Sequence, residues 1–449
     1  FNPLPRLYHW YRRLHPRHRR AAVLAAASEQ FRHSAWEWPI DRRNDWILSH
    51  LRQTLVNAAS GSTFYRRRLA DAGVDPAAIG FEEFGQLPAL TREEVAEHSA
   101  EILLADPDDP QVRRDSTGGS SGRPTTIWKG IEERAWGEGG IDFFMRRHRM
   151  PPGARQALLW GHHLDTRESD SWRARLHALA SNATWLEAFR LSPELLMAHH
   201  DCLNRLRPDY IVAYAGALAE LAAVVERSGI PPVYPQVALV TGAEKVHRHE
   251  RELIERVFGV PLLERYGSRD VGLMAFQTDP DASLGFEVDW PNLLIEPETS
   301  DPESPILVTK LHADAFPMIR YRVGDLARFA ADAKPGHPSF RLLEILGREL
   351  EMIQIGPDSW LSGTNFPHMF KDFPVADFQV YQGADAAVEV RVVPTDRSAW
   401  TEEVTSRFDG GMRAVLGGTP HTLLFVGEIP RTAANKRRPV ISELARRRQ

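Results

Sequence analysis

Residues 210–241 read YIVAYAGALAELAAVVERSGIPPVYPQVALVT and carry the strongest signal for a fold class. An apolar run of strand type (210–214) precedes a helical pattern over 215–228, and a second strand-type run follows at 236–241. Strand, helix and strand in this order form a crossover unit in which the two strands lie parallel in one sheet. We therefore expect an α/β fold with a largely parallel sheet.

The same alternation continues on both sides of this stretch. Further strand-type runs occur at 125–129, 156–161, 183–189 and 260–266, and helix-type runs at 131–147, 193–206 and 247–258. In such sheets, the loops that follow the carboxyl ends of the strands bind ligands. Polar motifs directly after these runs are therefore the first candidates for a functional site.

The rest of the chain divides into three regions. A leader of about 1–105 has mostly helical patterns, with a capping box expected at Thr91–Glu94. Residues 285–346 have only short strand-type runs broken by Pro, Gly and Asp, which indicates a compact antiparallel region. From 347 to 449 the pattern mixes strands with a helix near 400–415. We expect a large N-terminal domain over 1–346 and a small α+β domain over 347–449.

Composition excludes several classes of protein. The 55 Lys and Arg residues against 60 Asp and Glu leave a net charge of −5, which gives no reason to expect a nucleic-acid partner. The longest apolar stretch, 210–225, is too short to span a membrane and contains Glu220. Cys202 is the only cysteine, so neither an intrachain disulfide nor a multi-cysteine metal site is possible, and we expect a reducing, cytoplasmic compartment.

The most informative motif is DSTGGSSGRPTT at 115–126. Glycine permits positive φ, so that successive backbone N–H groups can point at one anion, and hydroxyls and Arg123 add donors for phosphate oxygens. A Walker loop is excluded because no Lys-Ser or Lys-Thr pair follows. Gly118–Gly122 also matches the GxSxG elbow of serine hydrolases around Ser120, although Pro124 disfavours the helix which that elbow needs. A phosphate-binding loop, a plain surface loop and a hydrolase elbow stay open at this point.

Further motifs follow in a fixed order: TGAE (241–244), YGSRDVG (266–272), IRYRVGD (319–325), GR (347–348) and PRTAANK (430–436). Together with the Gly-rich segment, this series resembles the adenylate-forming (acyl-activating) superfamily, in the branch of phenylacetate–CoA ligases and capsule-biosynthesis proteins. The resemblance spans residues 115–440. It implies a large adenylate-forming domain with mixed β-sheets and helices, followed by a small mobile lid domain.

The resemblance also implies roles for individual residues. The Gly-rich segment would hold the β- and γ-phosphates of ATP through Ser120, Ser121, Gly122 and Arg123, while Thr117 and Gly119 would shape the turn. The nucleotide would further contact Gly242, Ala243, Glu244, Tyr266, Gly267, Ser268 and Arg269, with the adenine between 242–244 and Tyr266. Asp325 would accept hydrogen bonds from the ribose hydroxyls, as a carboxylate with two oxygens can.

Two catalytic residues are implied in the C-terminal part. Lys436 would enter the active site from the lid and bridge the carboxylate and the α-phosphate, and Arg348 would reach the ribose or phosphate from the hinge. By itself, the basic run NKRRP (435–439) is typical of a solvated surface, so only order and spacing select Lys436. Asp270 stands where the family usually has a Glu that contacts Mg²⁺. Leu350 occupies a hinge position that is commonly acidic.

The implied activity is activation of a carboxylic acid with ATP and Mg²⁺ as an acyl-adenylate, with release of pyrophosphate, and transfer to an acceptor. We expect CoA as acceptor; the alternatives are an amine, or a non-catalytic nucleotide-binding relative. The acid is expected to be aromatic or another small organic acid of natural-product metabolism. His163, Trp185 and Tyr214 are candidates for its pocket, although core packing explains the aromatic residues equally well. The sequence decides neither the acid nor the oligomeric state.

Overall fold

A computed structural model describes residues 16–117, 125–151, 153–160, 181–188, 191–348, 352–356, 360–362, 366, 370, 373–430 and 438–444. The chain divides into two compact units. The first comprises 1–302, 307–321 and 329–344, and the second comprises 303–306, 322–328 and 345–449. Within the described ranges, no helix is long and apolar enough to cross a membrane.

The leader of the first unit is helical. Its helices are α2 (Pro16–Ala35), α3 (Ile40–Gly61), α4 (Thr63–Asp71), α5 (Phe81–Phe84), α6 (Arg92–Glu97) and α7 (Ser99–Ile102). The expected capping box begins α6: the Thr91 hydroxyl accepts from the Glu94 amide at 3.2 Å, and the Glu94 carboxylate accepts from the Thr91 amide at 2.8 Å. Two backbone N–H groups at the N-terminal end of the helix thereby have hydrogen-bond partners.

The centre of the first unit alternates strands and helices as expected. The strands are β1 (Arg113–Thr117), β2 (Thr125–Lys129), β3 (Gln156–Leu159), β4 (Ala183–Leu186), β5 (Tyr210–Ala213), β6 (Ala238–Thr241) and β7 (Leu262–Ser268). The helices are α8 (Ile131–Arg147), α11 (Pro193–Leu206), α12 (Ala215–Ser228) and α13 (Arg248–Phe258). The predicted crossover units are therefore confirmed.

The short strands that follow are β8 (Gly272–Phe276), β9 (Phe286–Val288), β10 (Leu293–Pro297), β11 (Glu303–Lys310), β12 (Tyr321–Phe329) and β13 (Arg341–Arg348). The main sheet has the order β10-β11-β12-β13-β9-β8-β7-β6-β5-β3-β4. Strands β4, β3, β5, β6 and β7 are parallel, and β8 and β9 add antiparallel neighbours. The expected antiparallel region is thus the continuation of the parallel sheet.

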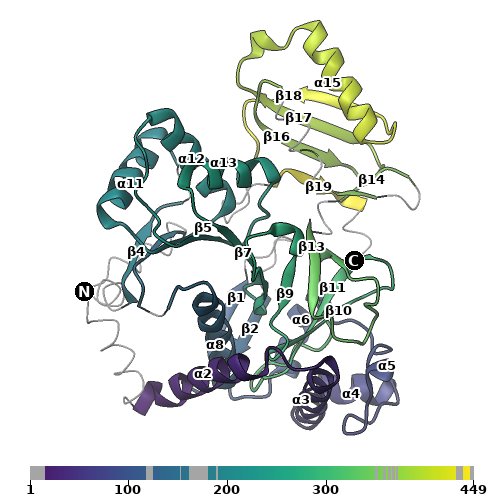
Figure 1. Cartoon of the computed structure of the whole chain (residues 1–449). Helices are drawn as coiled ribbons and strands as arrows, with labels where there is room; N and C mark the ends of the chain where they lie inside the picture. The colour runs from purple at the N-terminus through teal and green to yellow at the C-terminus, as the bar shows by residue number, and fades with distance from the viewer. Residues whose placement is uncertain are drawn as a thin grey trace. The chain divides into compact units, whose positions relative to one another are not determined.

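Helices lie on both faces of the main sheet, three of them over its parallel strands and α8 against β8. Helices α11, α12 and α13 pack on one face over a core that includes Leu159, Leu218 and Leu239 (Figure 1). Helix α8 lies on the other side and packs against α2 (Figure 1). Because apolar side chains of β5 and β6 are buried throughout, these strands read as continuous hydrophobic runs rather than as alternating ones.

The second unit has its own sheet and core. Its strands are β14 (Met352–Gln354), β15 (Trp360–Ser362), β16 (Val375–Gln382), β17 (Val388–Pro394), β18 (His421–Phe425) and β19 (Val440–Ser442). Four of them form a sheet in the order β18-β17-β16-β19, and α15 (Glu402–Val415) buries Phe408 and Met412 in the core of this unit. Strands and a helix in this small unit agree with the α+β pattern read from the tail.

Candidate functional site

The Gly-rich segment connects the two strands of an antiparallel hairpin. β1 and β2 pair with Thr117 opposite Thr125, so the strands run up to both ends of residues 118–124. The predicted phosphate-binding residues Gly119, Ser120, Ser121, Gly122 and Arg123 lie outside the described residues, as does the side chain of Thr117. A strand follows the segment, whereas the hydrolase elbow needs a helix there. This rules out the elbow at Ser120.

The base of this hairpin is tied to the YGSRD motif by Lys129, a residue that the sequence analysis missed. Its ammonium group donates to the backbone oxygen of Arg269 at 2.5 Å and lies 3.5 Å from Asp115 Oδ2. Burial lowers the pKa of Lys129, and the nearby Lys310 lowers it further. No local pattern marks Lys129, because its partner Arg269 is 140 residues away.

The parallel strands bring several predicted residues to one edge of the sheet. Residues 242–244 follow β6, Tyr214 follows β5, and Tyr266 lies near the end of the adjacent β7. A Cβ on Gly242 would lie only 3.2 Å from Arg265 Cγ, so glycine lets the end of β6 approach β7 closely. Ala243 has φ of 66°, a left-handed conformation that is costly for a residue with a side chain.

Glu244 holds the loop after β6 against a helix. Its Oε2 accepts a hydrogen bond from the backbone N–H of Gly216 at 3.0 Å, in the first turn of α12. A carboxylate at a helix N-terminus satisfies an otherwise unpaired donor and interacts favourably with the helix dipole. The loop 242–244 is therefore positioned by side-chain chemistry as well as by β6.

The turn between β7 and β8 has a specific backbone shape. The pairing of these strands shifts register between Tyr266 and Gly267, and a Cβ on Gly267 would lie 2.4 Å from the Gly272 oxygen. No other residue type fits position 267 without movement of the backbone. The Ser268 hydroxyl accepts from the Val271 amide at 3.2 Å, which closes the turn.

Asp270 is the candidate for a Mg²⁺ contact. It is 9% exposed, and its Oδ2 accepts from the Tyr321 hydroxyl at 2.8 Å. No cluster of three His, Cys, Asp or Glu side chains that could form a metal cage occurs within the described ranges. Mg²⁺ is commonly bound by one or two carboxylates together with substrate phosphates and waters, so a single carboxylate fits that mode of binding.

The candidate acid pocket has an aromatic pair. Trp160, after β3, stacks on Tyr214 with ring centroids 4.1 Å apart and an interplanar angle of 13°. Trp185 on β4 is 52% exposed, so the alternative that it packs in the core is wrong. His163 lies outside the described residues.

The remaining predicted residues belong to the second unit. Asp325 lies inside β12, and Gly324 before it has φ of 80°. The left-handed glycine alters the strand locally without ending it. Arg348 is the last residue of β13, but its side chain is outside the described part of the chain, and so is Lys436.

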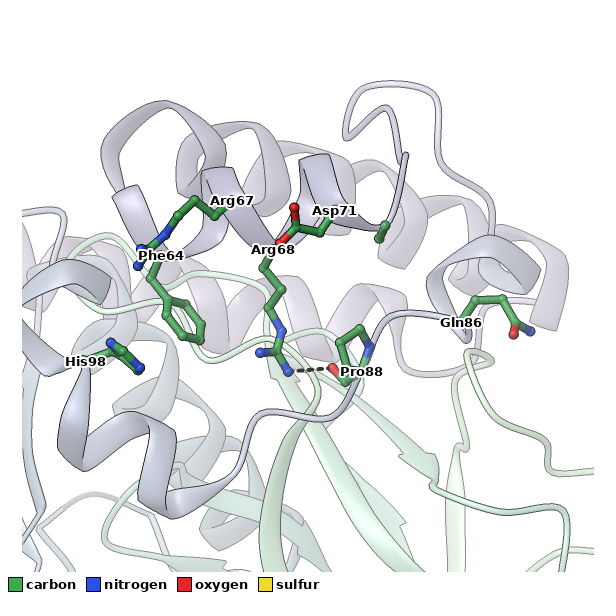
Figure 2. A pocket seen from close by; sticks show the side chains of 8 residues that line it. Phe64, Arg67, Arg68, Asp71, Gln86, Pro88 and His98 are labelled. Carbon is green, nitrogen blue, oxygen red and sulfur yellow. Dashed lines mark hydrogen bonds between the residues drawn. The ribbon is translucent and has the colours of Figure 1, made fainter.

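A shallow depression occurs elsewhere in the first unit, on the helical leader (Figure 2). Its lining residues are Phe64, Arg67, Arg68, Asp71, Ala72, Gln86, Pro88 and His98. Both arginines are engaged within the leader: Arg68 donates to Glu94 at 2.8 Å and to the Pro88 oxygen at 3.0 Å, and Arg67 pairs with Glu101. The depression contains no residue of the predicted motifs.

Comparison with known proteins identifies relatives in sequence and in structure. No family model matches the chain. The chain is 24% identical to the phenylacetate-coenzyme A ligase of Pseudomonas putida over 70% of its length and 73% of that protein. It is 19% identical to Protein CapK of Staphylococcus aureus over 85% of each chain.

Solved structures share the fold. The 2-hydroxyisobutyryl-CoA ligase in its postadenylation state, in complex with an acyl-AMP, matches with a TM-score of 0.68 and 19% identity over 91% of this chain and 92% of that one. The amide bond synthetase McbA from Marinactinospora thermotolerans matches with a TM-score of 0.50 and 16% identity over 77% and 71%. The predicted fold class is thereby confirmed.

Proposed function

We propose that this chain is a ligase which activates a carboxylic acid with ATP, because it belongs to the adenylate-forming superfamily, in the phenylacetate–CoA ligase-like branch. The main structural support is the position of three motifs in the first unit. The loop 242–244 and the Tyr266 motif end neighbouring strands, and Lys129 ties the base of the Gly-rich hairpin to Arg269. A nucleotide at this edge would meet all three.

In the first step, a carboxylate oxygen of the acid attacks the α-phosphorus of ATP. The new bond joins this oxygen to phosphorus, the bond to the bridging oxygen breaks, and pyrophosphate leaves with that electron pair. We assign the Gly-rich segment 118–124 to the phosphates and assign 242–244 and Tyr266 to the adenine. Donors that are positioned before the reaction stabilise the charge that develops on the phosphate oxygens.

Mg²⁺, when bound, would neutralise charge on the phosphates, and Asp270 would hold it. The hydrogen bond from Tyr321 fixes one carboxylate oxygen of Asp270, which fits a direct contact through the other oxygen or a contact through water. Aspartate is one methylene shorter than the glutamate usual in the family.

The segment 347–449 is proposed to act as the lid of the reaction. In this proposal Lys436 contacts the reacting carboxylate and the α-phosphate, and Arg348 contacts the ribose or phosphate. Asp325 accepts hydrogen bonds from the ribose hydroxyls. A lysine side chain is a compact charge on a flexible stem, which suits a group that must enter and leave between two steps.

The acceptor in the second step is proposed to be the thiol of CoA. The support is the sequence similarity to a phenylacetate-coenzyme A ligase over 70% of the chain. An amine acceptor is the second candidate, because the fold is shared with an amide bond synthetase. Incubation with ATP, an activated acid and either CoA or amines, with mass spectrometry of the products, distinguishes the thioester from the amide.

The adenylation step is tested by exchange of labelled pyrophosphate into ATP in the presence of candidate acids. We expect acid-dependent exchange with the wild-type protein and a loss of at least about a hundredfold in Lys436→Ala, since a positioned charge at the reacting phosphate is removed. Arg437→Ala is the matched control and should retain exchange. ATP binding without exchange for any acid would favour a nucleotide-binding protein without catalysis, and unchanged exchange in Lys436→Ala would remove this lysine from the mechanism.

A further inference from the structure

Arg265 lies at the same edge of the sheet and is partly buried, in a setting that differs from that of the buried Arg32 and Arg320. Its guanidinium carbon is 5.7 Å from the centroid of the Trp160 ring, and Trp160 in turn stacks on Tyr214. Its side chain also lies against Gly242, where an added Cβ would be 3.4 Å from Nε. Arg265 therefore lies between the aromatic pair and the loop after β6.

The neighbouring residue on β7 shows which face Arg265 occupies. Glu264 pairs with Arg251 of α13 at 2.6 Å, so Glu264 points to the face that the helices α11–α13 cover. Successive side chains of a strand point to opposite faces. Arg265 therefore points to the other face, away from α13.

Within the described ranges, Arg265 has no carboxylate at ion-pair distance and no hydrogen-bond acceptor. Two arginines that are almost fully buried have such partners: Arg32 with Asp289 at 2.7 Å, and Arg320 with Glu296 at 3.0 Å. Burial lowers the pKa of Arg265, as expected for a cation that is removed from water without a counter-ion.

A partly buried guanidinium that has no carboxylate partner is incompletely compensated, and an anionic ligand supplies the missing charge. Its planar fork matches a carboxylate with two parallel hydrogen bonds. The position at the carboxyl ends of parallel strands is where α/β sheets bind ligands. The aromatic faces of Trp160 and Tyr214 provide apolar contact for the body of that ligand.

We propose that Arg265 binds a second carboxylate of the substrate, so that the acid which this ligase activates is a dicarboxylic acid. One carboxyl group reacts with ATP, while the other stays ionised on Arg265 beside the Trp160–Tyr214 pair. This inference rests on the proposed function, because it assigns the substrate class for the same site.

Matched pairs of acids test the inference, each differing by a carboxylate in place of a methyl group: terephthalate with 4-methylbenzoate, and glutarate with pentanoate. Calorimetry measures the binding of each acid to the full chain, and pyrophosphate exchange measures its activation. We expect the wild-type protein to bind at least one diacid at least about tenfold more tightly than its partner. Arg265→Met should remove this preference while it leaves the monoacid unchanged, and Arg265→Lys should restore part of it.

Arg256→Met is the control. Arg256 of α13 forms an exposed ion pair with Glu226 of α12, and its removal should leave the preference for the diacid unchanged. Equal wild-type binding of mono- and diacids would overturn the inference without use of any variant. An equal loss of binding of both acids in Arg265→Met, with an unchanged circular dichroism spectrum, would overturn the inference as well, since Arg265 would then hold the reacting carboxylate. Arg265-dependent diacid binding without exchange would support the inference and contradict the proposed adenylation.

Discussion

The buried ion pair of Lys310 and Glu133, near Lys129, offers a sharp test of the energetics of this fold. Lys310 on β11 donates to Glu133 Oε1 on α8 at 2.7 Å, and the two side chains are only 2% and 9% exposed. The other oxygen of Glu133 has no hydrogen-bond partner among the described residues. Lys310→Met keeps the length of the side chain but leaves the Glu133 carboxylate buried without its partner.

Removal of one member of a buried pair costs about 3–5 kcal/mol, because the remaining charge is uncompensated. We therefore expect Lys310→Met to lower the free energy of unfolding by that amount, measured from urea unfolding followed by circular dichroism. The exposed pair of Arg256 with Glu226 is the reference: Arg256→Met should cost about 1 kcal/mol or less. The double variant Lys310→Met/Glu133→Leu should recover most of the loss, because the buried charge is then absent.

The pH dependence of this loss has a defined sign. Burial raises the pKa of Glu133 above its ordinary value, and removal of Lys310 raises it further. The folded variant therefore takes up a proton at a higher pH than the unfolded chain, so its deficit should shrink as the pH falls from 8 to 5. A loss no larger than that of Arg256→Met at pH 7, or a double variant as unstable as Lys310→Met, would refute this reasoning.

Two further predictions concern single side chains. Lys129→Met removes the contact between the hairpin and Arg269. We therefore expect the KM for ATP in pyrophosphate exchange to rise about tenfold, with a smaller change in kcat, and Lys129→Arg to restore part of the KM. An unchanged KM in Lys129→Met would contradict this role. Burial lowers the pKa of His312, which stacks on Trp136 at 3.6 Å, to about 3. The contribution of the neutral His312 imidazole to the free energy of unfolding is therefore complete above pH 6.5. It declines by up to about 1.4 kcal/mol per pH unit below pH 6.5. The urea midpoints of wild type and His312→Gln should converge as the pH falls from 7 to 4.5, and a constant difference would be inconsistent with a neutral buried imidazole.

Local patterns sufficed for the crossover units and for the Thr91 capping box. In both cases the information lies within one or two turns of chain: an apolar period for each element, and a side chain that satisfies a nearby backbone group. The motifs at 241–244 and 266–272 could also be located beforehand, because they directly follow strand-type runs. The short strands after residue 285 could not be assigned to the main sheet, since strand pairing depends on distant partners.

The sequence by itself determined the order of elements, the position of each motif and the resemblance to one superfamily, because these depend on neighbouring residues and on spacing along the chain. Only the tertiary structure decided which charges are paired. The Lys129 ammonium donates to the backbone oxygen of Arg269 across 140 residues, and Lys310 pairs with the Glu133 carboxylate across 177. Arg265 lacks a carboxylate partner within the described chain, although it is adjacent in sequence to Glu264. Alternate side chains of a strand point to opposite faces, and Glu264 pairs with Arg251. Electrostatic pairing follows distance in space, and the packed sheet sets that distance.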